Sequence, residues 1–243
     1  EVKDGKMTLN FDKEIVRKLW DNYYVPYVKG YFVASGRFRS DDIKTGNILA
    51  YVGSTSSATF FPIQVMTSDT ESHDIELELT PPEFEGGKKV AVQQGAGMVV
   101  TKGSDEEIEA SVEFLKYLTE PENNTSFSIG SGYLPVTQKA NDMVEIRKGG
   151  TDLPKSMDKV LTKAVETVNN NELYTTPAFE GGQDARSVLE YSMSDLADAD
   201  RKAVQERIDA GQTMEAATEE FLTGEYFDRW YEDTLTKLQA YEG

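Results

Sequence analysis

The sequence has no cysteine among its 243 residues, which excludes disulfides, a thiolate nucleophile and cysteine-ligated metals. Its single histidine, His73, lies in the polar stretch SDTESHDIEL and is interpreted as a surface residue, so neither a zinc site nor a Ser-His-Asp triad is expected. No apolar run approaches the length of about 18 residues that a transmembrane helix needs. The opening EVKDGKMTLNFDKEIV lacks the basic start and apolar run of a signal peptide. The protein is therefore expected either to be cytoplasmic or to have a targeting segment that was removed or is not included in this sequence.

Basic residues are also scarce, since 25 lysines and arginines stand against 43 aspartates and glutamates, for a net charge of −18. Such a surface repels a nucleic-acid backbone and an anionic membrane. The basic runs are no longer than pairs such as Lys88-Lys89. No nucleic-acid partner is therefore expected.

Motifs for nucleotide, metal and nucleophile sites are missing as well. GAGMVV, at residues 95–100, has a valine where a dinucleotide fingerprint needs its third glycine. GSGY, at residues 130–133, is one residue too short for a nucleophile elbow, and no P-loop motif occurs. DLADADRKAV has no glycine after Asp200, as a calcium loop requires. We expect no cofactor and no bound metal.

What the sequence does contain is the composition of a globular protein, with 38% hydrophobic and 10% aromatic residues. FDKEIVRKLWDNYYVP predicts a helix capped by Asp12 that ends before Pro26. Its apolar face is predicted to hold Val16, Leu19 and Tyr23.

A second helix is predicted in SDEEIEASVEFLKYLTEP, where Ser104 and Glu107 form a capping box and Pro121 ends the pattern. Its apolar stripe is predicted to be Ile108, Val112 and Leu115.

Strands and helices alternate along the rest of the chain. Strands are predicted at Ile48–Val52, in DIELELTPP and on either side of Gly95-Ala96-Gly97, and a short helix precedes the first of them. Helices are predicted in SMDKVLTKAVETV, in GGQDARSVLEYSMSDL, in the charged and solvated DADRKAVQERIDAGQ, and from Thr213 to Tyr241 with a break at Gly224. This order indicates an α/β fold with a helical C-terminal half.

Aromatic residues next to glycine-rich loops are the most informative candidates for a site. Tyr133 follows a glycine turn, Phe60-Phe61 follow a serine and threonine run, and Phe179 precedes Gly181-Gly182. Aromatic rings beside hydroxyls and backbone amides are typical of a sugar-binding cleft, although the same residues could simply pack in loops. Arg186 could bind a hydroxyl, carboxylate or phosphate, or form a surface ion pair.

The order of these segments resembles the extracellular solute-binding proteins of bacterial ABC transporters, in the group with the maltose- and glycerol-3-phosphate-binding proteins. The most specific part is GAGMVVTKGSDEEIEASVEFLKYLTEPENNTSFSIGSGYLPV, and YTTPAFEGGQDARSVLE extends the likeness more loosely. In that family two α/β lobes close over a ligand, and the chain crosses between lobes at a hinge. The resemblance implies that SGYLPV is a hinge-crossing, cleft-lining segment.

The resemblance also implies a periplasmic-binding-protein type II-like fold, of which this chain is mostly the helix-rich C-terminal lobe. Residues 1–94 would form the α/β part of the second lobe, residues 95–132 the hinge crossing and a return segment of the first lobe, and residues 133–243 the helical part of the second lobe. Positions that match cleft residues of the family are Gly53, Ser54, Thr55, Phe60, Gly95, Gly97, Tyr133, Phe179 and Arg186.

The function that follows from the resemblance is capture of a solute, a carbohydrate rather than glycerol phosphate, and its delivery to an ABC transporter permease, with no enzymatic step. The protein would act outside the cell, as a lipoprotein or in the periplasm. As a C-terminal portion the chain would bind ligand weakly and could self-associate through its return segment. Two other functions stay open: a carbohydrate-active enzyme that uses two carboxylates, and an interaction domain without a small-molecule ligand.

Overall fold

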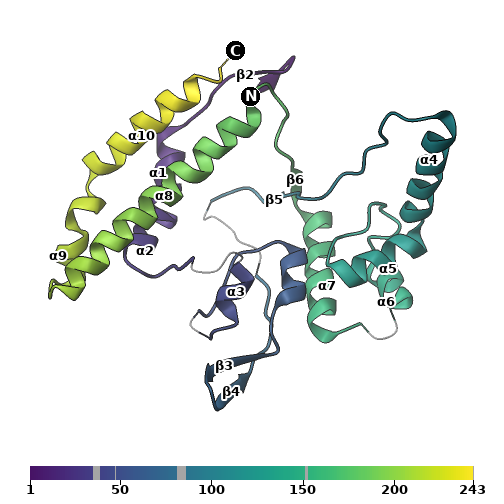
Figure 1. Ribbon diagram of the computed structural model, residues 1–243, viewed down its shortest axis with the longest axis horizontal. Helices are drawn as coiled ribbons and strands as arrows, with labels where there is room; N and C mark the ends of the chain where they lie inside the picture. The colour runs from purple at the N-terminus through teal and green to yellow at the C-terminus, as the bar shows by residue number, and fades with distance from the viewer. Residues whose placement is uncertain (35–38, 47, 81–85, 151–152, 243) are drawn as a thin grey trace. The chain divides into compact units, whose positions relative to one another are not determined.

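The computed structural model describes residues 1–34, 39–46, 48–80, 86–150 and 153–242 (Figure 1). The chain forms two compact units. Unit 1 consists of Glu1–Val33 and Thr176–Gly243, and unit 2 consists of Ala34–Thr175. Helices dominate both, with short strands between them, which confirms the predicted helix-rich α/β class.

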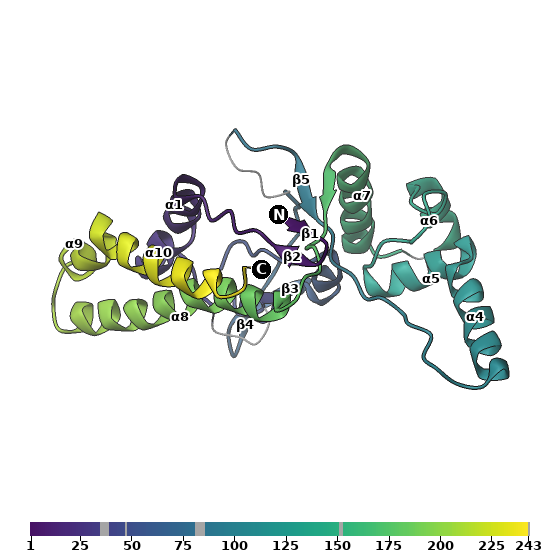
Figure 2. The same ribbon diagram turned by 90° about the horizontal axis from the view of Figure 1, so that it is seen from above.

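Unit 1 is a helical unit with an aromatic core. Helices α8 (Gly182–Asp209) and α10 (Gly224–Gln239) lie side by side in both views (Figures 1 and 2), and α2 (Tyr24–Val28) also packs on α8. The buried rings include Trp20, Tyr24, Phe227, Trp230 and Tyr231. The elements are β1 (Val2–Lys3), β2 (Lys6–Met7), α1 (Lys13–Asn22), α2 (Tyr24–Val28), α8 (Gly182–Asp209), α9 (Met214–Thr218), the 3-10 helix η2 (Glu219–Leu222) and α10 (Gly224–Gln239).

Helix α1 begins as predicted but buries a different face. Asp12 Oδ1 accepts hydrogen bonds from the backbone N–H groups of Glu14 and Ile15, at 3.0 and 2.9 Å, which confirms the cap. The helix buries Val16 and Trp20, whereas Leu19 and Tyr23 are partly exposed.

The predicted helix ends before Pro26, since α1 stops at Asn22, but a second short helix, α2, follows it and runs through this proline. Pro26 lies in the first turn of α2, where its missing N–H removes no intrahelical hydrogen bond.

The C-terminal helices follow the sequence pattern with one correction. The two helices predicted after Gly181 are a single helix, α8, and its charged second half is not simply solvated because Asp200 and Val204 are buried. The break before α10 is confirmed, since Thr223 Oγ1 accepts a hydrogen bond from Tyr226 N at 3.2 Å.

Unit 2 packs short strands and helices around α7. Its core includes Leu77, Ile146, Met157 and Leu161. The elements are α3 (Arg39–Ile43), the 3-10 helix η1 (Thr55–Phe60), β3 (Gln64–Ser68), β4 (Glu71–Asp74), β5 (Val90–Val92), α4 (Asp105–Thr119), α5 (Pro121–Ser131), α6 (Met143–Gly149), α7 (Lys155–Asn170) and β6 (Glu172–Tyr174).

Two small sheets accompany these helices in unit 2. Strands β3 and β4 form an antiparallel hairpin with Val65 opposite His73. Strands β5 and β6 pair in parallel, with Ala91 opposite Leu173.

Three strand predictions are corrected. The strand expected after Gly97 is absent, since Met98–Val100 is not in a strand, whereas β5 lies before the glycines as predicted. Ile48–Val52 is not a strand, and with Leu49 and Val52 exposed it has neither a buried face nor a paired edge among the described residues. In DIELELTPP the alternation is real, since Leu77 is buried between exposed neighbours, but the ladder ends at Asp74. Ile75 N still donates to the Ile63 carbonyl at 2.9 Å, and residues 76–80 belong to no strand. The double proline, residues 81–82, lies outside the described residues.

Helix α4 has the predicted capping box. Ser104 N donates to Glu107 Oε2 at 2.8 Å, and Glu107 N donates to Ser104 Oγ at 3.3 Å. No residue of this described helix is buried, so the predicted apolar stripe lies at the surface. Pro121 ends α4 and begins α5, a helix that the sequence pattern did not indicate (Figure 2).

Candidate functional site

A turn rich in hydroxyl groups forms the first part of the candidate site. The run GSTSSATFF folds into η1, which Ala58 anchors in the core of unit 2. Ser57 Oγ donates to the Ser54 carbonyl at 2.7 Å and Thr59 Oγ1 donates to the Ser56 carbonyl at 2.8 Å. These local bonds are the ones that Ser and Thr use to stabilise tight turns. The turn therefore presents hydroxyl groups on a fixed backbone.

Gly53 fits at the start of this turn because it has no side chain. A Cβ at this position would lie 2.4 Å from Ser57 Oγ and 2.8 Å from Cε2 of Tyr51. The Ser54 and Ser56 hydroxyls lie 3.0 Å apart, and no described residue bonds to the exposed hydroxyl of Thr55. The start of η1 thus combines a tight backbone with hydroxyls that can bind an external polar group.

The second part is the C-terminal end of α5, which contacts η1 through Gly132. Gly132 caps α5 in the left-handed conformation, with φ of 73°. A Cβ on Gly132 would lie 2.9 Å from the Thr55 carbonyl oxygen and 3.0 Å from Ser56 Cα. The two segments, far apart in sequence, are therefore in backbone contact.

The residues after Gly132 are held in place by core and polar contacts. Leu134 packs against the core of unit 2. Val136 N donates to Asn124 Oδ1 at 2.7 Å, and Asn141 Nδ2 donates to the Pro135 carbonyl. Tyr133 therefore stands on a fixed backbone beside η1, with its ring partly exposed.

The two runs that form this site contain no charged side chain. Residues 45–68 and 123–138 contain no Asp, Glu, Lys, Arg or His, although 28% of the chain is charged. The contact between Gly132 and η1 brings these two runs together. The arrangement offers hydroxyls, backbone groups and aromatic rings, which suit a neutral polar ligand.

The structure places the remaining predicted residues elsewhere. Gly95 and Gly97 lie in the exposed loop between β5 and α4, where no described atom lies within 4 Å of an added Cβ. Phe179 and Arg186 belong to unit 1. The Phe179 ring packs on Gly182, and Arg186 is exposed on α8 without an ion pair to any described residue. Among the nine predicted positions, Gly53, Ser54, Thr55, Phe60 and Tyr133 lie on η1 or next to it in unit 2.

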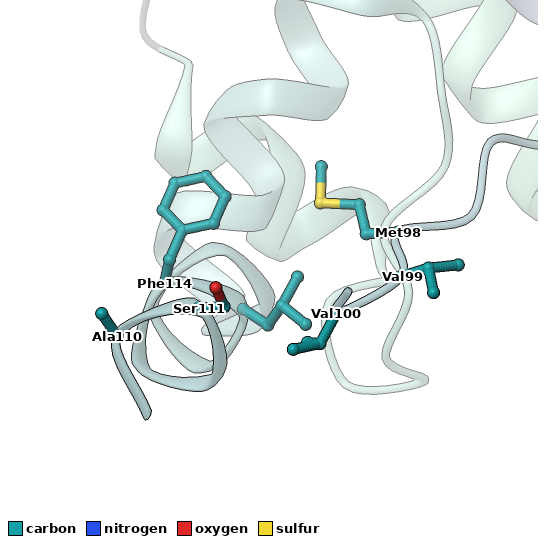
Figure 3. Close-up of a pocket in the computed structure, with 7 residues that line it drawn as sticks. Met98, Val99, Val100, Ala110, Ser111 and Phe114 are labelled. Atoms are coloured by element: carbon teal, nitrogen blue, oxygen red, sulfur yellow. The ribbon is translucent and has the colours of Figure 1, made fainter. Parts of the chain in front are cut away.

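A hollow of about 520 Å³ lies near the Gly95–Gly97 loop (Figure 3). Met98, Val99 and Val100 line one side of it, and α4 lines the other with Ala110, Ser111, Phe114 and Leu115. The lining contains one hydroxyl and no charge, so this surface suits apolar packing better than a polar ligand.

Sequence reasoning singled out neither Gly132 nor Phe127. Gly132 could have been found as a glycine after a helical run, the usual C-cap signal, had α5 been predicted. Phe127 lies on α5, and its ring centroid is 6.2 Å from that of Tyr133. Nothing in the local sequence distinguishes it from a core phenylalanine.

The described ranges hold neither a metal cluster nor a membrane-spanning helix. They contain no group of three or more His, Asp or Glu side chains that could hold a metal ion. None of the helices in this part of the chain is long and apolar enough to cross a membrane.

Comparison with known proteins gives one match. A family model described as a bacterial extracellular solute-binding protein matches residues 3–154, more than half of the chain. Searches of curated proteins and of solved structures found no match. The matched region includes η1, the Gly95–Gly97 loop and Tyr133, whereas Phe179 and Arg186 lie beyond it.

Proposed function

The chain belongs to the bacterial extracellular solute-binding proteins, and we propose that its solute is a neutral carbohydrate. The family binds small-molecule solutes outside the cell for transport, with a transporter permease as partner, and is generally non-enzymatic. We propose that this chain likewise delivers its solute to an ABC transporter permease and catalyses no reaction.

The observation that carries the carbohydrate proposal is the contact between the two uncharged runs. Gly132 holds the end of α5 against η1, so the residue before Tyr133 is in contact with the turn that carries the hydroxyls of Ser54, Thr55 and Ser56. Sugars present hydroxyls that exchange hydrogen bonds with such groups and C–H faces that pack on aromatic rings. A solute of this chemistry needs no charged partner.

The charge of the chain favours a neutral sugar over a sugar phosphate or glycerol phosphate. A phosphate carries a charge that proteins usually meet with Arg, Lys or a helix N-terminus. The uncharged runs at η1 and α5 supply no cation, and the net charge of −18 opposes the approach of an anion. Arg186 of unit 1 could bind a carboxylate, so an acidic sugar is the alternative to be tested.

We also propose that the chain is the C-terminal portion of a longer binding protein that works in the periplasm or as a membrane-anchored lipoprotein. Residues 1–94 and 133–243 would belong to its second lobe and residues 95–132 to the crossing and a return into the first. The exposed surfaces of residues 95–132 and of the neighbouring β5–β6 pair support the proposal. Helix α4 buries no residue, and the parallel pair β5–β6 exposes Val92 and Tyr174, whereas parallel sheets are normally covered on both faces.

When the chain stands alone, we propose that a second copy covers this surface. The Gly95–Val100 segment is apolar and largely exposed, and it forms no backbone hydrogen bond with any described residue. Two identical free edges of this kind can pair with each other. The hollow between Met98 and Phe114 would then receive apolar side chains of the other copy.

A thermal-shift panel of neutral sugars, sugar acids and sugar phosphates on the full-length gene product tests the carbohydrate proposal. A ligand at about 100 times its dissociation constant adds about 2.7 kcal/mol of stability, so a neutral sugar should raise the unfolding midpoint by several degrees. A rise with sugar phosphates alone would contradict the neutral-ligand proposal. A folded protein that responds to no member of the panel would contradict the carbohydrate proposal.

A further inference from the structure

Helix α5 has an unusual distribution of side chains. It buries Asn124, Thr125 and Ser128, while Phe127 on the same helix is 49% exposed. A helix on a globular protein normally buries its apolar residues and exposes its polar ones. Packing within unit 2 therefore explains the polar face of α5 and leaves the position of Phe127 unexplained.

The buried polar face of α5 takes part in hydrogen bonds of the fold. Ser128 Oγ donates to the Asn124 carbonyl at 2.9 Å, and Asn124 Oδ1 accepts from Val136 N. The first bond lies within α5, and the second ties α5 to the segment that follows Tyr133. Phe127 is consequently held at the surface.

One side chain sets the spacing between Phe127 and Tyr133. Ser131 Oγ donates to the Phe127 carbonyl at 2.7 Å and accepts from Tyr133 N at 3.3 Å. The two rings pack at 6.2 Å between centroids with an interplanar angle of 37°. Tyr133 is 39% exposed, so the pair presents a joint apolar surface.

The segment that carries Tyr133 is in contact with the hydroxyl-rich turn η1. Gly132, directly before Tyr133, is in contact with the Thr55 carbonyl and Ser56. The hydroxyl of Tyr133 bonds to no described residue, so it can donate to or accept from a ligand. An apolar ring surface bordered by hydroxyls matches a cyclic sugar, which has a C–H face and a rim of hydroxyls.

We infer that Phe127 and Tyr133 form a stacking platform for the face of a pyranose ring, with the hydroxyls of η1 at its rim. The inference rests on the proposed function and deepens it, since it names the ring form of the sugar and a specificity-determining residue, Phe127. An open-chain polyol has the same hydroxyls without a rigid C–H face. The platform therefore favours pyranosides over such polyols.

The test is a calorimetric titration of the full-length gene product and its variants with maltose, methyl α-glucopyranoside and the open-chain polyol sorbitol. Phe127→Ala should weaken pyranoside binding about tenfold or more and leave sorbitol binding unchanged, while Phe127→Trp should keep pyranoside affinity. Phe32→Ala, at a phenylalanine of unit 1 that is 46% exposed, is the matched control and should have no effect. Pyranoside C–H protons should shift upfield in NMR spectra of the wild type and less in Phe127→Ala, a readout that a purely structural role would not change.

The outcomes separate this inference from the proposed function. Pyranoside binding by the wild type that Phe127→Ala leaves unchanged would overturn the platform and keep the carbohydrate proposal. An equal loss of sorbitol and pyranoside binding in Phe127→Ala would also overturn it, because no ring face would be recognised. Failure of the wild type to bind any of these sugars would overturn the platform and count against the proposed function.

Discussion

Gly132 lies at a position where the backbone and the surrounding space both exclude a side chain. Its φ of 73° is in the left-handed region that non-glycine residues avoid. The Thr55 carbonyl occupies the space that a Cβ would need. Gly130, two residues earlier within α5, has neither restriction, because an added Cβ there would meet no described atom within 4 Å. The GSG sequence thus contains two glycines with opposite requirements.

We predict that Gly132→Ala lowers the free energy of unfolding by about 2–3 kcal/mol, through left-handed strain and the displacement of η1. Gly130→Ala should instead raise it by about 0.5–1 kcal/mol, because alanine favours the helix. Urea denaturation of both variants measures the difference. Equal effects of the two substitutions would show that the contact between α5 and η1 is not formed in solution.

Helices α4 and α5 show how far the sequence predicts the elements. The capping box of Ser104 and Glu107 is local, so the sequence alone is enough to locate α4. PENNTSFSIGS contains few strong helix formers, and α5 depends on contacts such as that between Asn124 and Val136, which lie outside any helical pattern. The prediction of a strand at Ile48–Val52 was wrong for the opposite reason. Its residues favour a strand locally, but they pair with no other described segment.

The candidate site was predictable only in its parts. The hydroxyl run at Ser54 and the aromatic Tyr133 stand out in the sequence, and both were predicted to line a cleft. Their approach depends on the contact between Gly132 and Thr55, a long-range contact that no local pattern encodes. The exposure of Phe127 depends on which face of α5 packs against the core of unit 2. That face buries polar residues, whereas helices usually bury their apolar ones.

The exposed face of α4 leads to a prediction about association. If a second copy covers this surface, Phe114→Glu places a charge in the hollow and should shift the chain from dimer to monomer in sedimentation velocity. Tyr117→Glu adds the same charge on the same helix at a residue that is 60% exposed and does not line the hollow, so it should leave the dimer intact. A wild-type chain that sediments as a monomer at all concentrations would contradict the proposal.

At the scale of the whole molecule, the two units carry separate cores and different reporters. Both tryptophans of the chain, Trp20 and Trp230, belong to the core of unit 1. Tryptophan fluorescence therefore follows unit 1 alone, whereas circular dichroism follows helices of both units. Unit 1 also contains the buried carboxylate Asp200, which accepts hydrogen bonds from Tyr24 at 2.5 Å and Tyr226 at 2.7 Å.

This cluster makes the stability of unit 1 sensitive to alkaline pH. Burial, together with the hydrogen bond to Asp200, raises the pKa of Tyr226 to about 12, and the same causes raise the pKa of Tyr24. In the unfolded chain a tyrosine ionises near its ordinary value of about 10. A group whose pKa is higher in the folded state stabilises the fold fully below its unfolded pKa, and this contribution is lost as the pH rises. The loss should therefore extend from about pH 10 to about pH 12.

We predict that the free energy of unfolding of unit 1, measured by denaturant titration with tryptophan fluorescence, falls with pH over this range. Tyr226→Phe removes one of the two donors to Asp200, which should cost about 1–2 kcal/mol at neutral pH, and it should flatten the alkaline slope because one raised pKa is gone. Tyr31→Phe, at a tyrosine of unit 1 that is 73% exposed, should change neither quantity. If the free energy of unfolding of Tyr226→Phe fell with pH as steeply as that of the wild type, ionisation of Tyr226 would not be the cause of the alkaline loss of stability.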